Sequence, residues 1–420
     1  MKKLSLHWKI LIGMALGVLF GFFMSTISGG GIFVSNWIKP FGTIFINSLK
    51  LIAIPLILAS LIKGVSDLKD ISKLSSMGTI TITTYLVTTV IAVSVGLFLV
   101  NIVKPGDTIS EKTRTELIGQ YDSEADKKRN AAAENKEAGP LQPLVDLVPS
   151  NFVAAASDNK NMLQVIFFSI LFGISIILIP PNKAKPIKDF FDSFNEVVLK
   201  IIDIIMMFAP YGVFGLLAAL IVESPNADLL KSLIMYSITL LIGLLFMIVI
   251  YLIIVKLLTG RNPLLFLKAI LPAQLVAFST SSSAATLPVT IDRVQNHLNV
   301  EKEVASFVLP IGATINMDGT AVYQAVAAVF IAQTFGLDLS FTAQLGIIST
   351  ATLASIGAAA VPSAGIIVLV IVLAQAGIPE AGLALIFAVD RPLDMFRTVV
   401  NITGDATVST IVSKFQKNQD

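Results

Sequence analysis

Long apolar runs dominate the first 260 residues of this chain. A helix needs about 20 mostly apolar residues to cross the hydrocarbon of a bilayer. Six runs of about that length or longer lie near 8–28, 40–62, 77–103, 147–180, 190–222 and 229–258. The first follows Lys2 and Lys3 like a secretory signal, but it has no convincing small-residue cleavage site and further runs follow. We therefore expect it to be a retained membrane helix.

Composition supports the same class of protein. Hydrophobic residues make up 55% of the 420 residues and charged residues 14%, with a mean hydropathy of +0.82, whereas a soluble domain carries about 25% charge. A soluble enzyme, a nucleic-acid-binding protein and a disordered protein are excluded for the chain as a whole. With no cysteine and only two histidines, thiolate chemistry and histidine-based metal sites are excluded too.

The lysine and arginine positions predict the orientation. Sixteen of them fall in segments that face the cytoplasm if the N-terminus does, and three fall in short segments that would face outside. This asymmetry predicts that both termini are cytoplasmic. The polar segment 104–146 carries charges of both signs, and we interpret it as a solvated external loop.

Two runs of small residues interrupt the second half. They read QLVAFSTSSSAATLPVT at 274–290 and TATLASIGAAAVPSAGI at 350–366. Each precedes a helix with a polar cluster, NMDGT at 316–320 and NITGD at 401–405. Close helix packing explains one such run, but two with matching clusters favour a pair of inverted repeats. Irregular backbone at membrane depth must be buried in protein or line a watery cavity, so we predict two re-entrant hairpins.

The last helix carries its polar residues on one side. At 100° per residue, a stripe about 100° wide holds nearly all the strongly polar side chains from 390 to 405, except Arg391 and Thr403. We call this set the polar stripe: Asp390, Asp394, Arg397, Thr398, Asn401 and Asp405. Each charge at the bilayer centre costs roughly 2.5–3.5 kcal/mol. The stripe is therefore expected to pair internally or to hold a ligand.

The residue types in the stripe indicate the ligand. The planar fork of Arg397 suits a carboxylate, and Asp394 can receive an ammonium group, so the pair suits an amino acid with an extra carboxylate. Oxygen atoms of Asp318, Asp405 and Asn316 suit sodium better than a transition metal. A salt-bridge network that only locks the bundle is the alternative, but it leaves Thr398 and Asn401 unexplained.

These motifs resemble the dicarboxylate/amino acid:cation symporter family, which includes archaeal aspartate transporters, bacterial glutamate symporters and animal excitatory amino acid transporters. The serine-rich segment 280–283, the NMDGT motif and the stretch 394–405 carry the resemblance, which covers essentially the whole chain. It implies an all-α membrane protein with eight transmembrane helices, two re-entrant hairpins, inverted repeats and elevator-type transport. It also implies a homotrimer in the plasma membrane that takes up L-aspartate or L-glutamate with sodium, without any other cofactor and without enzymatic activity.

The resemblance also implies a division of the chain. A scaffold would contain helices 1 and 2 within 1–76 and helices 4 and 5 within 147–223. A transport domain would contain helix 3 at 77–103 and the segment 229–420, which holds helix 6, a first hairpin at 262–297, helix 7, a second hairpin at 340–376 and helix 8. The external loop 104–146 would connect the two.

Residue by residue, the resemblance implies one substrate site and three sodium sites. The substrate positions are Ser282, Thr320, Val361, Gly365, Asp394, Arg397, Thr398 and Asn401. The first sodium site maps to Tyr85, Thr88, Thr89, Asn316 and Asp318, and the second to Gly312, Asn316, Asn401 and Asp405. The third maps to backbone groups of Thr314, Ser355, Ile356 and Ala358.

Two departures from the family pattern bear on mechanism. Archaeal members carry an arginine at the Thr280 position and animal members one at the Met395 position; here Arg391 either replaces it or anchors the cytosolic edge. Animal members carry a glutamate at the Gln324 position, which is tied to proton and potassium coupling. Because Gln324 cannot titrate, we predict sodium coupling without potassium counter-transport.

Three other functions are weighed against this one. A proton-coupled symporter would use Asp390 or Asp394 as the proton carrier. An intramembrane enzyme would need a base beside Ser282 or two close, mutually perturbed carboxylates at Asp318 and Asp405, and neither is indicated. A channel would need the hairpins to line a permanent pore.

Overall fold

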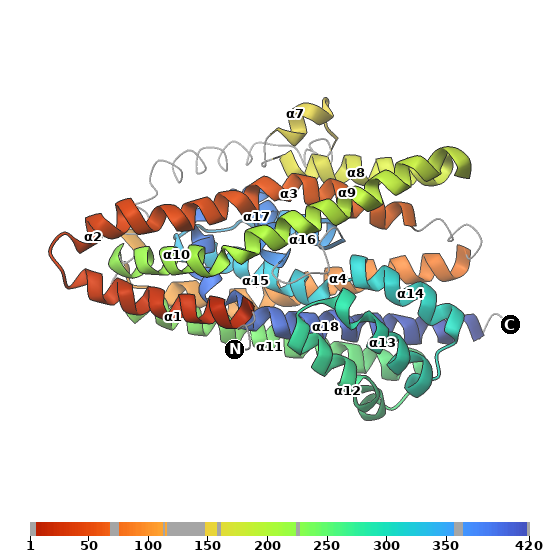
Figure 1. Cartoon of the computed structure of the whole chain (residues 1–420). Helices are drawn as coiled ribbons and strands as arrows, with labels where there is room; N and C mark the ends of the chain where they lie inside the picture. Colours follow the sequence, from red (N-terminus) through yellow and green to blue (C-terminus); the bar gives the residue numbers. More distant parts are fainter. Residues whose placement is uncertain are drawn as a thin grey trace, which may run out of the picture.

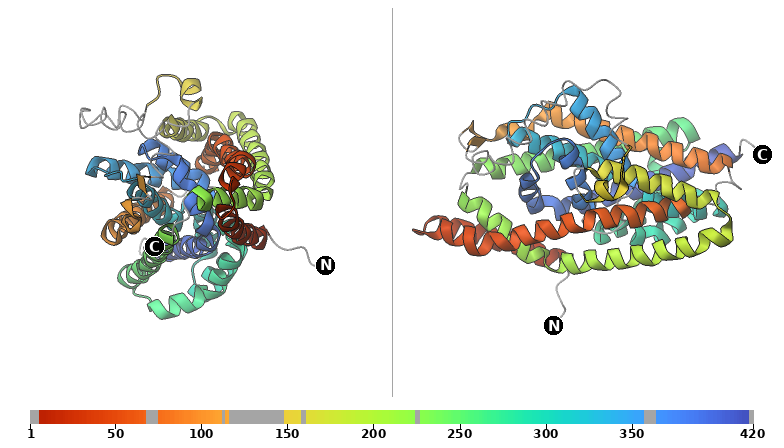
Figure 2. Two further views of the ribbon diagram at one scale, coloured as in Figure 1. Left: turned by 90° about the vertical axis from the view of Figure 1, so that its left-hand side faces the viewer. Right: turned by 90° about the horizontal axis from the view of Figure 1, so that it is seen from above.

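The described part of the chain is helical throughout its regular structure. The computed structural model describes residues 6–67, 75–111, 114–115, 148–157, 161–223, 227–356 and 364–417, and these contain helices but no strands. The long helices run along one common direction (Figures 1 and 2). The predicted all-α class is confirmed for these residues.

Four of the predicted apolar runs form single long helices. They are α1 (Leu6–Ser25), α3 (Lys39–Asp67), α4 (Ser75–Val103) and α11 (Ala227–Ile254). Two short elements, α2 (Gly30–Phe33) and the π-helical η1 (Val34–Ile38), join α1 to α3, and the π-helical η5 (Val255–Thr259) extends α11. By length and composition, five helices in the described residues can cross a membrane, or six if one bent pair counts as a single span.

The other two runs differ from the prediction. The run 147–180 contains a short α7 (Phe152–Ala156) and a separate α8 (Met162–Leu178). The run 190–222 belongs to α9 (Pro181–Met207) and α10 (Ala209–Glu223), which meet at an angle of 50°. Pro210 lies just after this break, and a proline has no N–H to continue the helical hydrogen bonds. Sequence hydropathy alone does not reveal such a bend.

The second half contains two pairs of shorter helices and two polar helix junctions. The first pair is α12 (Pro263–Thr280) and α13 (Ser283–Leu298); the second is α16 (Phe341–Ile356) and α17 (Ala364–Gln375). Between the pairs lie α14 (Lys302–Ile315) and α15 (Asp318–Thr334), and after them the short η6 (Glu380–Gly382) and the long α18 (Leu383–Lys417). The helices of each pair contact each other, in the regions predicted as hairpins.

The core is centred on α15. Every residue of this helix except Gln333 is buried, as expected for a helix that is surrounded by protein. It packs against α4, α11, α16, α17 and α18, while α18 also packs against α11, α12 and α14. On another side of the bundle, α1 packs on α10, and α3 packs on α8, α9 and α10 (Figure 2).

Three glycines let α1 approach α10 closely. A Cβ atom added at Gly17 would lie 2.7 Å from the carbonyl oxygen of Phe214, and one at Gly13 would lie 2.5 Å from that of Pro210. Gly21 is as crowded, with Ile221 Cβ at 2.8 Å. The spacing of four residues places all three on one face of α1.

We expect Gly17→Ala to lower the thermal stability of the detergent-solubilised protein. The backbone of α10 must shift to admit the new methyl group, and overpacking of this kind costs about 1–3 kcal/mol. Gly346→Ala is the matched control, because nothing lies within 4 Å of a Cβ at that position of α16. Equal melting temperatures for the two variants would contradict this account of the helix contact.

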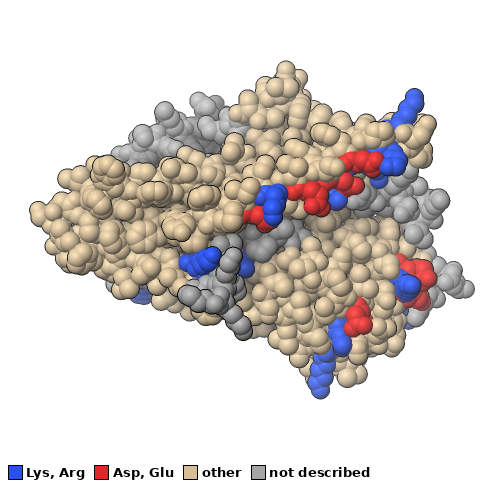
Figure 3. Space-filling model, in the orientation of Figure 1, with Lys and Arg blue, Asp and Glu red and all other residues tan. Residues whose placement is uncertain are grey.

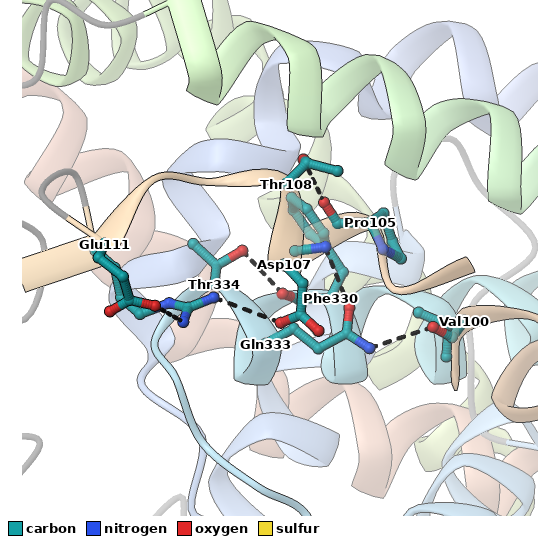
Figure 4. Close-up of polar contacts among 10 residues, drawn as sticks. Val100, Pro105, Asp107, Thr108, Glu111, Phe330, Gln333 and Thr334 are labelled. Carbon is teal, nitrogen blue, oxygen red and sulfur yellow. Dashed lines mark hydrogen bonds and ion pairs between the residues drawn. The ribbon is translucent and has the colours of Figure 1, made fainter. Parts of the chain in front are cut away.

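The start of the predicted external loop is packed against α15. Residues Pro105–Thr108 form the 3-10 turn η3. The N–H of Gly106 donates to Gln333 Oε1 at 3.1 Å, and Gln333 Nε2 donates to the carbonyl of Val100 at 3.2 Å (Figure 4). Arg114 pairs with Glu111 at 2.7 Å and Asp107 at 3.4 Å. The loop therefore begins with an ordered turn; residues 116–147 lie outside the described part.

A row of charged side chains follows α9 (Figure 3). It includes ion pairs from Lys185 to Asp189 at 2.6 Å and from Lys200 to Asp203 at 3.1 Å. Lys63 of α3 joins it by pairing with Asp192 at 2.5 Å. The surrounding exposed residues, such as Phe190 and Val197, are apolar.

Candidate functional site

The helix break at residues 316–317 brings polar groups into the core. Asn316 ends α14 with extended backbone angles (φ −91°, ψ 94°), and Met317 precedes α15 with φ −118° and ψ 47°. Neither residue is helical, so backbone groups that would bond within a continuous helix are free to face neighbours. Asn316 and Asp318 are both 0% exposed. The predicted NMDGT cluster is thus the junction between two buried helices.

The polar stripe lies on α18 and is buried along its whole length. Its six members, Asp390, Asp394, Arg397, Thr398, Asn401 and Asp405, are between 0% and 6% exposed. The helical-wheel prediction that these side chains share one inward face is confirmed. Thr403, which the wheel placed elsewhere, is also buried, and its hydroxyl accepts a hydrogen bond from Gln274 of α12 at 2.9 Å.

Arg397 lies between two carboxylates and an aromatic ring. Its Nη2 is 2.7 Å from Asp394 Oδ1 and 2.9 Å from Asp390 Oδ1. Its Cζ lies 3.9 Å from the centroid of the Tyr323 ring, in cation–π geometry. Arg391 makes a further ion pair with Asp394, from Nη1 to Oδ2 at 3.1 Å. Two arginines and two aspartates therefore form one buried network with balanced charge.

Part of the Arg397 fork is not used by this network. Its Nε and Nη1 are buried and have no hydrogen-bond partner among the described residues. Gly365 of α17 lies beside Nη1, since a Cβ atom added there would be 3.1 Å from Nη1 and 3.2 Å from Thr320 Cγ2. Buried guanidinium N–H groups are costly without acceptors. Nη1 lies next to Gly365 and Thr320, and the Nε–H points to the Nη2 side of the fork. A carboxylate that binds Arg397 through two parallel hydrogen bonds therefore needs Nη2, which Asp390 and Asp394 hold here.

A first group of oxygen atoms surrounds Asp318. Thr89 of α4 donates its hydroxyl hydrogen to Asp318 Oδ1 at 2.6 Å, and Tyr251 of α11 donates to Oδ2 at 2.5 Å. The hydroxyl of Thr88 donates to the carbonyl of Tyr85 at 3.0 Å, one turn away on α4. Three helices thus contribute hydroxyl, carboxylate and carbonyl oxygens, the ligand types that hard cations prefer.

A second group of oxygen atoms surrounds Asp405 of α18, one turn after Asn401. Asn316 Nδ2 donates to Asp405 Oδ1 at 2.9 Å and to the carbonyl of Asn401 at 3.3 Å. The Oδ1 of Asn316 is buried and has no hydrogen-bond donor among the described residues. A Cβ at Gly312 would collide with both the Tyr85 hydroxyl and Asp405 Oδ1. The absence of a side chain at Gly312 therefore leaves oxygen atoms of α4, α14 and α18 close to one another.

Asn401 connects the two helices of the break to the stripe. Its Oδ1 accepts from the Gly319 N–H at 2.8 Å, and its Nδ2 donates to Met317 Sδ at 3.2 Å. Its carbonyl is the one that accepts from Asn316. This residue was predicted for both the substrate and the second sodium site, and it lies next to residues of both.

The remaining predicted positions are placed as follows. Ser282 caps α13, where its Oγ accepts from the Ala285 N–H at 3.2 Å, and Thr398 donates to the carbonyl of Asp394 at 2.9 Å. Thr314 is exposed on α14, Ser355 is buried on α16, and Ile356 ends α16; α14 and α16 contact each other. Val361 and Ala358 lie outside the described residues.

Sequence reasoning missed three side chains at this site. Tyr251 is one of two tyrosines in the apolar run of α11, where a tyrosine is ordinarily interpreted as a packing residue. Met317 was predicted only as part of the NMDGT motif, and no role was predicted for Tyr323. Each was undetectable from spacing, because its role depends on a contact with another helix: with Asp318, Asn401 and Arg397 respectively.

Comparison with known proteins decides the family. The profile of the Sodium:dicarboxylate symporter family matches residues 6–415. This chain belongs to that family. It is 35% identical to the proton/sodium-glutamate symport protein of Bacillus caldotenax, over 99% of the chain and 96% of the relative. It is 33% identical to the proton/glutamate-aspartate symporter of Escherichia coli, over 100% of the chain and 94% of the relative.

Animal relatives match over most of their length as well. Excitatory amino acid transporter 3 of Homo sapiens is 38% identical over 90% of the chain and 79% of the relative. As a member of the Sodium:dicarboxylate symporter family, the chain is a transporter and not an enzyme. Its apolar helices fit a multi-pass membrane protein.

Proposed function

We propose that this symporter takes up L-aspartate or L-glutamate together with sodium ions. The main support for an acidic substrate is the state of Arg397. This residue is wholly buried, and its Nε and Nη1 have no hydrogen-bond partner among the described residues. A fully buried cation with unused donors suits an anionic ligand that supplies paired oxygens. Asp394 would receive the ammonium group, and Thr398 and Asn401 would contact the backbone of the amino acid.

The proposed sodium sites rest on the two oxygen groups described above. Asp318 with Thr88, Thr89 and Tyr85 supports one site, and Asp405 with Asn316, Asn401 and Gly312 supports a second. The third, formed by backbone groups of Thr314, Ser355, Ile356 and Ala358, is supported only by the contact between α14 and α16. No group of three His, Cys, Asp or Glu residues in the described ranges could hold a metal ion, so carbonyl, amide and hydroxyl oxygens would provide most ligands.

We further propose an elevator mechanism within a homotrimer of eight-helix protomers with two re-entrant hairpins. The contacts of α4, α11 and α12–α18 with one another, and of α1, α3, α8, α9 and α10 with one another, support a mobile transport domain and a fixed scaffold. The charged row along α9 supports a trimer, because charges facing lipid are costly and those facing another protomer or water are not. We also propose that the protein resides in the plasma membrane; the distribution of lysine and arginine supports an orientation with both termini cytoplasmic.

The driving force for such uptake is considerable. A tenfold sodium gradient supplies about 1.4 kcal/mol per ion, and a potential of about 100 mV supplies about 2.3 kcal/mol per charge. If three sodium ions accompany one monoanion, the net charge moved is +2 and the available work is roughly 9 kcal/mol. A half-loaded site would carry uncompensated charge across the membrane, which would make uncoupled movement slow.

A proton-coupled symporter is the second candidate. Two of the relatives have protons in their names, and Asp318, Asp390, Asp394 and Asp405 are all buried carboxylates. Against it, Gln324 is wholly buried on α15 beside Tyr323 and carries no titratable group at that position. Among the described residues its amide has no hydrogen-bond partner either.

Uptake into proteoliposomes separates the two candidates. We expect labelled L-aspartate or L-glutamate to accumulate when a sodium gradient is imposed at equal pH on both sides. A pH gradient without sodium should give no accumulation above that of empty liposomes, because no proton is needed to complete the proposed sites. Accumulation driven by the pH gradient alone would favour the proton-coupled symporter, and failure of both gradients would refute acidic amino acid uptake.

A further inference from the structure

A second arginine lies against the carboxylate that is proposed to receive the substrate amine. Arg391 Nη1 is 3.1 Å from Asp394 Oδ2, and the Arg391 side chain is only 11% exposed. The sequence left two roles open for this residue, and the contact with Asp394 is not that of an anchor in a water-exposed edge. Asp394 is thus held by one arginine on each oxygen, Arg391 on Oδ2 and Arg397 on Oδ1.

The surroundings of Arg391 provide few other counter-charges. Arg391 and Asp390 line a small cavity between α18 and the helices α1, α3, α9, α10 and α17. Its other lining residues are apolar, among them Ile10, Phe45 and Val213. A guanidinium in such a position is retained only when a carboxylate compensates its charge. Among the described residues, Asp394 is the carboxylate with which Arg391 forms an ion pair.

Substrate binding as proposed requires the Arg397–Asp394 ion pair to open. Arg397 must turn toward the substrate carboxylate, and Asp394 must accept the ammonium group on the oxygen that Arg397 leaves. If Arg397 were the only cation on Asp394, the carboxylate would lose its position at the moment when the amine arrives. Arg391 keeps Oδ2 occupied throughout, so that Oδ1 stays where the ammonium group can reach it.

We infer that Arg391 is a positioning residue for the substrate amine: it fixes Asp394 while the ammonium group replaces Arg397 on the other oxygen. This inference rests on the proposed function. It predicts that Arg391 matters for ligands that carry an ammonium group and much less for dicarboxylates that lack one. Succinate is the useful probe, because it has the two carboxylates of aspartate without the amine.

The test compares both ligands on Arg391→Met. Competition against labelled substrate at saturating sodium gives the affinity for L-aspartate, L-glutamate and succinate. Removal of one partner of a buried charge pair weakens binding by about tenfold or more, and we expect this loss for both amino acids. Succinate should change less than about twofold, and Arg391→Lys, which keeps the charge, should recover most of the amino acid affinity.

Two controls keep the result interpretable. Arg293→Met removes an arginine of α13 whose ion pair is with the adjacent Asp292, and it should alter none of the affinities. Sodium-dependent thermal stabilisation of Arg391→Met should match that of the wild type, because the sodium sites do not include this residue; a merely structural defect would reduce it. If the Met variant does not fold, Arg391→Gln takes its place.

Two outcomes overturn the inference. Unchanged amino acid affinity would mean that Asp394 needs no second cation, and an equal loss for succinate would mean that Arg391 acts only as a general positive charge. If succinate does not displace labelled substrate even from the wild type, the sodium measurement decides. A loss of amino acid affinity in Arg391→Met that is accompanied by a loss of sodium-dependent thermal stabilisation then overturns the inference. A wild type that binds neither amino acid refutes the proposed function instead.

Discussion

Arg397→Ala is expected to abolish the uptake of acidic amino acids, with a loss of at least about a hundredfold in affinity. The variant removes a buried guanidinium whose Nη1 lies beside Gly365 and Thr320 and whose Nε and Nη1 have no hydrogen-bond partner among the described residues. It also leaves Asp390, which pairs with Arg397 at 2.9 Å, without its cation. Uptake into proteoliposomes and calorimetric titration with L-aspartate and L-glutamate provide the measurement.

The same variant separates the substrate from the cation sites. Sodium-dependent thermal stabilisation should survive, because the oxygen groups around Asp318 and Asp405 do not include Arg397. Arg397→Lys keeps the charge but not the planar fork, so it should also lose most of the affinity, and Arg293→Ala is the matched control. Unchanged affinity for aspartate and glutamate in Arg397→Ala would contradict the proposal that Arg397 binds the substrate carboxylate.

The second large effect is expected at Asp405. Asp405→Asn keeps the size of the side chain and can keep the acceptor for Asn316 Nδ2, which lies 2.9 Å from Oδ1. It removes one negative charge from the proposed second sodium site, and the charge of the ligands sets cation affinity. We expect the sodium concentration for half-maximal uptake to rise about tenfold or more.

The control for this variant is a carboxylate outside the core. Asp292→Asn changes an aspartate of α13 whose side chain is 52% exposed, and it should leave the sodium response unaltered. The measurement is initial uptake rate against sodium concentration at constant ionic strength. If Asp405→Asn responds to sodium as the wild type does, Asp405 is not a ligand; if it instead loses a dependence on pH, the proton-coupled candidate gains support.

The sequence predicted the polar stripe well because one helix determines it. Side chains three, four and seven residues apart on α18 must share a face, and the cost of placing the four charged ones in lipid required that face to be inward. The structure places all six in the core. For the small-residue runs, a helix break falls at 281–282 within the first run, whereas residues 357–363 of the second lie outside the described part, and the two re-entrant hairpins stay a prediction.

What the sequence could not provide were contacts between helices. The wheel put Arg391 outside the stripe, yet its long side chain reaches Asp394. Tyr251 lies in an apolar stretch of α11, and only the structure shows that its hydroxyl donates to Asp318. The bend between α9 and α10 lies next to Pro210, and hydropathy carries no information on it. The assignment of individual ligands stays a prediction for the experiments above.

One shared asparagine has a thermodynamic consequence. The side chain of Asn401 accepts from the backbone N–H of Gly319, and its carbonyl accepts from the side-chain amide of Asn316. A cation bound by Asn316 and an amino acid bound by Asn401 therefore act on the same group of hydrogen bonds. Linkage then requires reciprocity. The factor by which saturating sodium tightens amino acid binding must equal the factor by which saturating amino acid tightens sodium, and two separate titrations must yield the same number.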